Sequence, residues 1–314
     1  YEKTLPKITQ FIFEIFIIYL CLTIICGILY FLVGMSSFDA IAHSLTTICT
    51  GGFSTHNESF KFFNSIEIES VSILFMIIGS LPFVIFLKVV HGDYKSFFRD
   101  EQIQLFIFIV LILIIFTSLW LIMNYNYKPI LALRMSSFNM VSILTGTGYT
   151  SSNFNSWGGF GLITLFIIMF IGGCAGSTTG GIKIFRLQLL FKGARIQIRK
   201  LSKPHGVFVT TFNKKTVAEE TFNSIMGFFF IYILIFILSS ILLGFLGLDF
   251  LTALSGAASA ISNVGPGLGE IIGPDGNYSS ISTSAKWILC FTMLIGRLEL
   301  FTFLILLTRS FWKK

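Results

Sequence analysis

Charged side chains are scarce in this chain of 314 residues: Asp, Glu, Lys and Arg together make up 12% of it, whereas 54% of its residues are hydrophobic. Its mean hydropathy is +0.84. A soluble domain of this length could not cover its surface with so few charged groups. The 37 phenylalanines agree with this, because helices that face lipid accept large apolar side chains for which a soluble core has no room. The composition therefore predicts an integral membrane protein.

Motifs of metal, redox and hydrolytic chemistry are also absent from the sequence. No two of the five cysteines have CxxC spacing, so neither a disulfide framework nor a zinc site is indicated. The apolar runs contain no paired aspartates, no HExxH and no GxSxG, which disfavours an intramembrane enzyme. The chain also lacks GxGxxG, so any control by a nucleotide would come from a partner. We expect no enzymatic activity and no cofactor held by this chain.

Six apolar runs are long enough to cross a bilayer as helices, which need about 20 residues each. The sequence therefore predicts an all-α protein with several spans. The chain opens on Tyr1 without a start methionine or signal peptide, which indicates a fragment that lacks its N-terminal part. The six runs cover roughly residues 8–33, 68–90, 103–123, 159–190, 222–247 and 285–308.

Lysine and arginine are distributed unequally between the two sides of these spans. Seventeen of the 22 fall on one side and four on the other, while Arg297 lies near the middle of the last span. Because cytoplasmic loops carry the excess of positive charge, both termini and the loops 88–103 and 183–221 are predicted to be cytoplasmic. The net charge of +7 is then explained by attraction to anionic membrane lipid, and no nucleic acid partner is needed.

A span, a short helix, a glycine-rich stretch and a second span follow one another three times along the chain. The short helices, expected at about 38–49, 131–145 and 250–262, reach only about half to two thirds of the way through the hydrocarbon layer. Helix C-termini followed by small-residue backbone at this depth suit a monovalent-cation filter made of carbonyl oxygens. Glycines that serve only close helix packing are the alternative for any single stretch. The candidate filter residues are Thr50, Gly51, Gly52, Phe53, Gly146, Thr147, Gly148, Tyr149, Asn263, Val264, Gly265 and Pro266.

Four longer motifs, at residues 50–56, 172–183, 263–269 and 296–302, resemble those of the Trk/Ktr/HKT superfamily of potassium transporters, and of the bacterial Trk-type membrane subunit in particular. That family surrounds a central ion pore with four helix–pore loop–helix repeats. The resemblance implies potassium uptake, with K⁺ as substrate at the filter carbonyls. It assigns residues 1–100, 101–221 and 222–314 to the second, third and fourth repeats, the first being absent from this sequence.

The stretch between Gly172 and Gly181 interrupts the fourth apolar run with five glycines, one serine and two threonines. Since each glycine costs about 1 kcal/mol in a helix, we expect this stretch to be unwound. A phosphate-binding loop is excluded, because no Lys-Ser/Thr pair follows Gly181. By resemblance, the stretch gates the pore together with Arg297, for which an interhelical ion pair is the alternative. The candidate gate residues are Gly172, Gly173, Ala175, Gly176, Ser177, Thr178, Thr179, Gly180, Gly181 and Arg297.

The cytoplasmic connection 183–220 contains nine basic residues, and anchoring to the membrane alone would account for this charge. Residues 200–209 mix apolar and basic side chains, which also fits a docking surface for another protein. By resemblance, the partner is a cytosolic ring of nucleotide-binding subunits, and the protein is a homodimer of the bacterial inner membrane. A sodium-conducting or sodium/potassium-coupled transporter of the same fold is one alternative function, so channel and symporter both stay open. A truncated, non-conducting membrane scaffold is another. His43 and His56 are expected to be structural.

Overall fold

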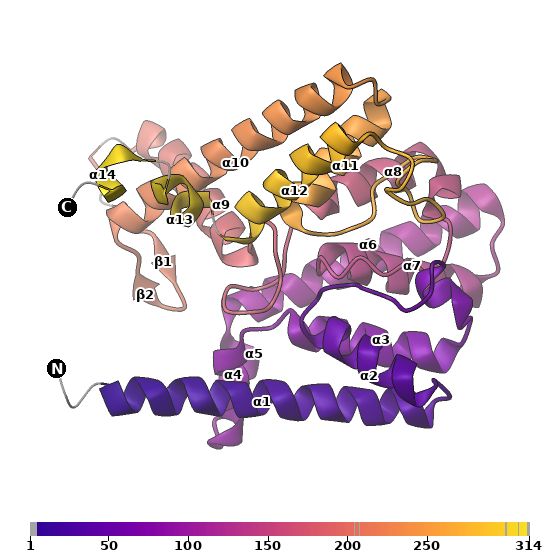
Figure 1. The fold of residues 1–314 in the computed structure, drawn as a ribbon. Coiled ribbons are helices and arrows are strands. Elements are labelled where there is room, and N and C mark those ends of the chain that lie inside the picture. The colour runs from indigo at the N-terminus through magenta and orange to yellow at the C-terminus, as the bar shows by residue number, and fades with distance from the viewer. Residues whose placement is uncertain (1–4, 204, 207, 299, 307, 313–314) are drawn as a thin grey trace. The chain divides into compact units, whose positions relative to one another are not determined.

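The computed structural model describes every residue except 1–4, 204, 207, 299, 307 and 313–314, and it is helical almost throughout (Figure 1). The prediction of an all-α protein is confirmed, apart from one two-stranded hairpin. The elements are α1 (Leu5–Leu32), α2 (Ser37–Ile48), η1 (Ser59–Phe62), α3 (Ile66–Gly79), α4 (Phe83–Val90), α5 (Lys95–Arg99), α6 (Glu101–Tyr125), α7 (Pro129–Leu144), η2 (Phe154–Trp157), α8 (Gly158–Met169), α9 (Ile184–Ser202), β1 (Thr211–Phe212), β2 (Lys215–Thr216), α10 (Glu219–Phe245), α11 (Phe250–Ser262), α12 (Thr283–Arg297), α13 (Leu300–Leu306) and α14 (Arg309–Trp312).

The helices form two compact units. Unit 1 comprises Tyr1–Ser152 together with Gly173–Thr179, and unit 2 comprises Asn153–Gly172 together with Gly180–Lys314. Within unit 1, α1 packs along α2 and α6 packs along α7; within unit 2, α10, α11 and α12 pack side by side (Figure 1). In each unit a short helix therefore lies against longer ones, as the repeat pattern in the sequence requires.

Among the described residues, three helices are long and apolar enough to span a membrane on their own: α1 over Ile8–Leu32, α6 and α10. Large apolar side chains on α1 are strongly exposed, Phe13 by 61% and Phe16 by 58%, which suits a lipid-facing helix. Two further helix pairs, α3 with α4 and α12 with α13, reach the required length and hydropathy only together. These five correspond to five of the six expected spans.

Two of the expected spans are bent, which the hydropathy did not predict. The run 68–90 divides into α3 and α4 at an angle of 93°, because Pro82 lacks an N–H and disfavours helical backbone in the residue before it. The last run divides into α12 and α13 at 111°. Arg297, expected near the middle of this span, lies at its bend as the final residue of α12, where a cation complements the helix dipole.

The three short helices lie where the sequence places them. Ser36 caps α2 by accepting the Asp39 N–H, and Asp249 caps α11 by accepting the Thr252 N–H. Pro129 opens α7 at its first turn, where a missing N–H does no harm. Their lengths of 12, 16 and 13 residues are too short for a comfortable crossing.

The expected fourth span, 159–190, is broken as predicted. α8 ends at Met169, and helix resumes only at Ile184, where α9 begins. Between them, Ile171 and Ile182 form an isolated parallel bridge. α9 then continues to Ser202, and the β1–β2 hairpin packs on it through Lys192, whose Nζ donates to Thr211 O (2.8 Å). The basic connection is thus an ordered helix followed by a hairpin, where the sequence analysis expected a loop.

A cluster of small and branched apolar side chains holds α11 against α10 and α12 in unit 2. Its alanines allow the helix backbones to approach closely. The ring of Tyr278, from the connection that follows α11, packs against the same cluster. We call it the α11 cluster; its buried members are Leu243, Ala253, Ala257, Ala260, Ile272, Ile281, Ala285 and Leu289.

Candidate functional site

Residues 50–53, here called loop A, turn sharply back on the end of α2. The N–H groups of Gly51 and Gly52 both donate to Thr46 O, at 2.8 and 3.4 Å. The Thr46 hydroxyl in turn donates to Phe53 O (2.9 Å). Gly52 has φ = 66°, which glycine adopts without steric cost. Because these N–H groups are taken up by the helix end, the intervening carbonyls are free to point elsewhere.

Residues 146–149, loop B, repeat this arrangement at the end of α7. The N–H groups of Thr147 and Gly148 donate to Ser142 O, at 3.0 and 3.1 Å. The buried Ser142 hydroxyl donates to Tyr149 O (2.7 Å). Gly146 and Gly148 have φ of 68° and 81°. Two segments almost a hundred residues apart in the sequence therefore share one backbone geometry.

Loops A and B are in direct contact within unit 1. A Cβ atom on Gly52 would lie 1.6 Å from Thr147 O, so no other residue fits without displacing backbone. The buried Tyr149 hydroxyl bonds the hydroxyls of Thr46 (2.6 Å) and Thr47 (3.2 Å). The structure thus brings eight of the twelve candidate filter residues, those of loops A and B, to one place.

Residues 263–266, loop C, follow α11 in unit 2 and match the pattern in part. Val264 N–H donates to Ser259 O (2.9 Å), and Gly265 has φ = 109°. The Ser259 hydroxyl, however, accepts the Gly265 N–H (3.0 Å). Asn263 ends α11 in the left-handed conformation, and its amide donates to Met293 O on α12 (3.2 Å). Loop C is therefore fixed to its own helix pair.

Each loop has one central glycine, which is Gly52 in loop A, Gly148 in loop B and Gly265 in loop C. The sequence analysis missed that a serine or threonine lies six positions before each of them. Thr46, Ser142 and Ser259 hold loops A, B and C by their backbone carbonyls and by their hydroxyls. The signal was present as a repeated spacing. It was hidden because serine and threonine are common in short polar helices and the preceding segments differ in sequence.

The middle of the glycine-rich stretch, Gly173–Thr179, belongs to unit 1 and is bonded to the bend between α3 and α4. Cys174 N–H donates to Ser80 O (2.9 Å), and Ala175 N–H donates to Gln102 Oε1 on α6 (2.8 Å). The Thr178 hydroxyl donates to Ile48 O (3.0 Å) and Gly79 O (3.1 Å). These bonds give the unwound backbone the protein partners that irregular backbone requires inside a membrane.

Thr178 also contacts loop A directly. Its hydroxyl lies 3.2 Å from that of Thr50, which has the unusual φ of 50° for a β-branched residue. A left-handed conformation costs such a residue about 1–2 kcal/mol, so the surrounding bonds must maintain it. The candidate gate and the candidate filter therefore share one hydrogen-bonded group of side chains in unit 1.

The two ends of the stretch lie in unit 2. Gly172 N–H donates to Ile182 O (3.0 Å), and a Cβ on Gly172 would lie 2.0 Å from Gly180 O. Gly180 in turn packs on Ser262 O at the end of α11. Gly296 of α12 packs in the same way on Ile261 O, directly before the exposed Arg297. Glycines thus allow two backbone segments to reach the helix end that leads into loop C.

Both histidines named in the sequence analysis make structural contacts beside loop A. The buried His43 ring bonds Asp39 O (2.8 Å) and Ser54 Oγ (3.0 Å). His56 stacks on Phe62, with ring centroids 3.7 Å apart, and its Nε2 lies 3.3 Å from Asp39 Oδ1. The hydroxyl of Thr55 above all, then that of Ser36 and the His56 ring, lowers the pKa of Asp39. Within the described part of the chain, no group of His, Cys, Asp and Glu could hold a metal ion.

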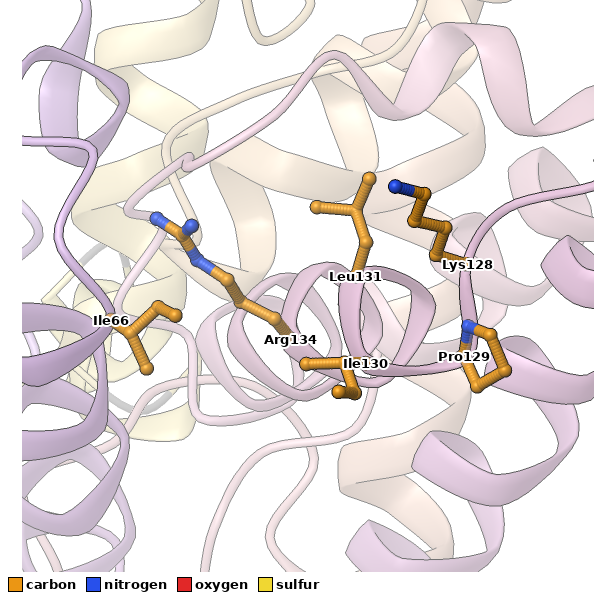
Figure 2. Close-up of a pocket in the computed structure, with 6 residues that line it drawn as sticks. All are labelled: Ile66, Lys128, Pro129, Ile130, Leu131 and Arg134. Atoms are coloured by element: carbon orange, nitrogen blue, oxygen red, sulfur yellow. The ribbon is translucent and has the colours of Figure 1, made fainter.

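A pocket of about 530 Å³ lies elsewhere on unit 1, at the start of α7 (Figure 2). Of its two basic residues, Lys128 and Arg134, the second is paired with the buried Glu69 at 2.8 Å. None of its residues is a candidate filter or gate residue. They are Ile66, Lys128, Pro129, Ile130, Leu131 and Arg134.

Comparison with known proteins relates this geometry to a family. The chain is 38% identical over its whole length to the Trk system potassium uptake protein TrkI of Halomonas elongata, and it covers 64% of that protein. It is 34% identical to TrkH of Escherichia coli K12, again over its whole length and over 65% of the relative. The chain thus spans just under two thirds of these relatives.

The fold has a counterpart among solved structures, the crystal structure of the potassium transporter TrkH from Vibrio parahaemolyticus. The two share 36% sequence identity with a TM-score of 0.92, over 98% of this chain and 66% of the other. The family model TrkH, described as a cation transport protein, matches residues 2–314. The chain therefore belongs to the TrkH family of cation transport proteins.

Proposed function

We propose that this chain forms the ion-translocating part of a potassium uptake subunit of the Trk type. One observation carries the proposal: after three short helices, glycine-centred loops turn their N–H groups back to the helix and leave carbonyl oxygens for a cation. The relatives at 34–38% identity are named potassium uptake proteins. The same fold passing sodium, or coupling sodium to potassium, is the alternative that the experiment below separates.

The filter in this proposal consists of loops A, B and C, which belong to the second, third and fourth of four repeats (residues 1–100, 101–221 and 222–314). A K⁺ ion loses its hydration water and gains carbonyl oxygens in its place. The positive-φ glycines matter because they let successive carbonyls turn toward the ion. The C-terminal ends of α2, α7 and α11 add the negative pole of a helix dipole behind each loop.

The gate in this proposal is the stretch 172–181 together with Arg297. The stretch is unwound and held by side-chain and backbone bonds, so that it can be released without unfolding a helix. Arg297 would repel cations from below the filter, because a positive charge in a pore raises the electrostatic barrier for K⁺. The alternative role for Arg297, in an interhelical ion pair, would show as lost stability when the arginine is removed.

In this proposal both termini and α9 lie on the cytoplasmic side of a bacterial inner membrane, which the excess of lysine and arginine supports. The partner in this proposal is a cytosolic ring of nucleotide-binding subunits that docks on the basic surface of α9, and the assembly is a homodimer. The chain itself supplies no nucleotide motif, which is why the regulatory nucleotide is assigned to the partner.

The test replaces the central glycines with serine in the intact gene and measures growth and Rb⁺ and Na⁺ fluxes in a strain that cannot take up potassium. We expect Gly52→Ser to be most harmful, since its Cβ would collide with Thr147 O at 1.6 Å. The Cβ atom added by Gly265→Ser would meet no atom within 4 Å. The substitution is disfavoured only by the backbone strain of a non-glycine residue at φ = 109°, so its effect on selectivity should be smaller. Gly148→Ser should also lower selectivity.

The matched control is Gly244→Ser in α10, where a Cβ meets nothing within 4 Å and the helix backbone accepts any side chain. This variant should transport as the parent protein does. If all three filter variants kept the parent's K⁺ to Na⁺ ratio, the filter assignment would be overturned. A parent protein that fails to rescue growth on low potassium, yet moves Na⁺, would favour the sodium alternative.

A further inference from the structure

The carbonyl of Gly265 has a partner that distinguishes loop C from loops A and B. The phenol hydroxyl of Tyr278 donates to Gly265 O at 2.6 Å. In loops A and B, a hydroxyl of the preceding short helix (Thr46 or Ser142) donates to the carbonyl of the residue after the central glycine, Phe53 or Tyr149. In loop C the corresponding hydroxyl, that of Ser259, is used instead as an acceptor for Gly265 N–H. Loop C is therefore held on its carbonyl side by a residue outside the short helix.

The position of Tyr278 is fixed by the core of unit 2. Its ring packs against the α11 cluster, which is built from three helices and the connection itself. The next residue is also tied down, since Lys286 Nζ of α12 donates to Ser279 O (3.0 Å). A phenol held at both its ring and its neighbouring backbone presents its hydroxyl in one direction.

The rest of the connection between loop C and α12 is equally well bonded. Gly267 N–H donates to Ile272 O (2.7 Å). The Asn155 side chain makes two bonds with Gly269, one to its carbonyl (2.8 Å) and one from its N–H (3.1 Å). Burial raises the pKa of Tyr278 to about 12, so its hydroxyl keeps its proton and donates throughout the physiological range.

We propose that Tyr278 is a positioning residue that adjusts the ion selectivity of the filter through the Gly265 carbonyl. The inference rests on the proposed function of loop C. A carbonyl oxygen has two lone pairs, and a donated hydrogen bond occupies one of them and leaves the other for an ion. The donor also withdraws electron density from that oxygen, which weakens the electric field that the ion experiences.

A weaker field favours the larger cation. Na⁺ is the more strongly hydrated of the two ions, and only a strong field from the protein compensates for the loss of its water. K⁺ loses its water more readily and tolerates a weaker carbonyl. The hydroxyl of Tyr278 should thus favour K⁺ over Na⁺, and it should also prevent the Gly265 carbonyl from turning inward to fit the smaller ion.

The experiment is Tyr278→Phe in the intact gene, which removes the hydroxyl and keeps the ring that packs on the α11 cluster. K⁺, Rb⁺ and Na⁺ fluxes are measured per molecule of protein in the membrane. We expect the K⁺ to Na⁺ flux ratio to fall by about two- to tenfold, the range that corresponds to one net hydrogen bond, while K⁺ uptake persists. The matched control is Tyr125→Phe at the exposed end of α6, which should leave the ratio unchanged.

Two results would overturn the inference. One is an unchanged K⁺ to Na⁺ flux ratio in Tyr278→Phe. The other is a lower amount of Tyr278→Phe in the membrane, with total K⁺, Rb⁺ and Na⁺ uptake reduced by the same factor, which would give Tyr278 a purely structural role. Gly52→Ser separates this inference from the proposed function. If Gly52→Ser alters the ratio and Tyr278→Phe does not, the filter assignment stands and the role of Tyr278 is rejected.

Discussion

A single hydroxyl in each short helix determines how the following loop is held. Ser142 is the best example, because it is fully buried and donates to Tyr149 O at 2.7 Å. Ser142→Ala would leave that buried carbonyl without its donor, at a cost of about 1–3 kcal/mol. We expect a lower midpoint of thermal unfolding in detergent and a lower K⁺ to Na⁺ flux ratio.

The control for this prediction is Ser137→Ala on the same helix, whose hydroxyl bonds back to Leu133 O of its own helix. That substitution removes only a local bond within the helix and should be close to neutral. Equal effects of the two substitutions would show that any lost hydroxyl in α7 weakens the protein. The anchoring of loop B would then have no special part in selectivity.

At this scale the sequence predicted the backbone better than the side chains. The sequence analysis named the glycines at 52, 148 and 265 as filter residues because such loops need positive φ, and all three have positive φ in the structure. The anchoring hydroxyls were not predicted, because a serine in a short helix has many possible partners. Which carbonyl it bonds depends on how the chain returns after the helix, and local sequence does not determine that path.

At the scale of elements, the glycine-rich stretch behaves as a segment bonded to its neighbours by a few polar groups. Thr178→Val removes the hydroxyl that bonds Ile48 O and Gly79 O but keeps the branched shape of the side chain. If the stretch is the gate, the looser segment should open more often. We expect ion flux per molecule to rise and to depend less on the cytosolic partner.

The matched control is Thr117→Val, a buried threonine within α6 and away from the stretch. Lower flux in Thr178→Val at normal protein levels would contradict the gate assignment. It would mean that the hydroxyl supports an open loop A, whose Thr50 lies 3.2 Å away.

The presence of the apolar membrane-length helices and of the three short helices was predictable from hydropathy and length, whereas the bends within two of the expected spans were not. The three short helices and the break after Met169 agree with the sequence analysis. The bend between α3 and α4 lies within one apolar run, and Pro82 was the sole local signal for it. The helical form of the basic connection was also missed, because its charge suggested a loop although α9 alternates apolar and basic residues as a surface helix does.

At the scale of the whole molecule, the composition predicted an integral membrane protein, and the distribution of lysine and arginine predicted its orientation in the membrane. The family match over residues 2–314 and the TM-score of 0.92 confirm the membrane-transporter fold. The contacts between loops A and B could not be derived from the sequence, since they join residues almost a hundred positions apart. Only the shared period of span, short helix and glycine loop indicated that the loops should be equivalent.

The last prediction concerns the basic surface of α9. Arg195, Arg199 and Lys200 are exposed on this helix and Lys203 directly follows it, whereas Lys192 already bonds the hairpin. Reversing these four to glutamate should weaken co-purification with a cytosolic nucleotide-binding subunit, because mismatched charge lowers both encounter rate and affinity. Membrane insertion should be kept, since thirteen of the seventeen cations on the predicted cytoplasmic side remain against four on the other side.

The control reverses Lys88, Lys95 and Arg99, which are exposed on the other connection of the same predicted side. If the α9 surface is the docking site, this control should retain the partner at both low and moderate salt, whereas the α9 variant loses it most clearly at low salt, where the introduced negative charges are least screened. Loss of the partner in both variants would indicate that net charge alone matters. Retention by the α9 variant and loss by the control would move the docking site to the connection between α4 and α6.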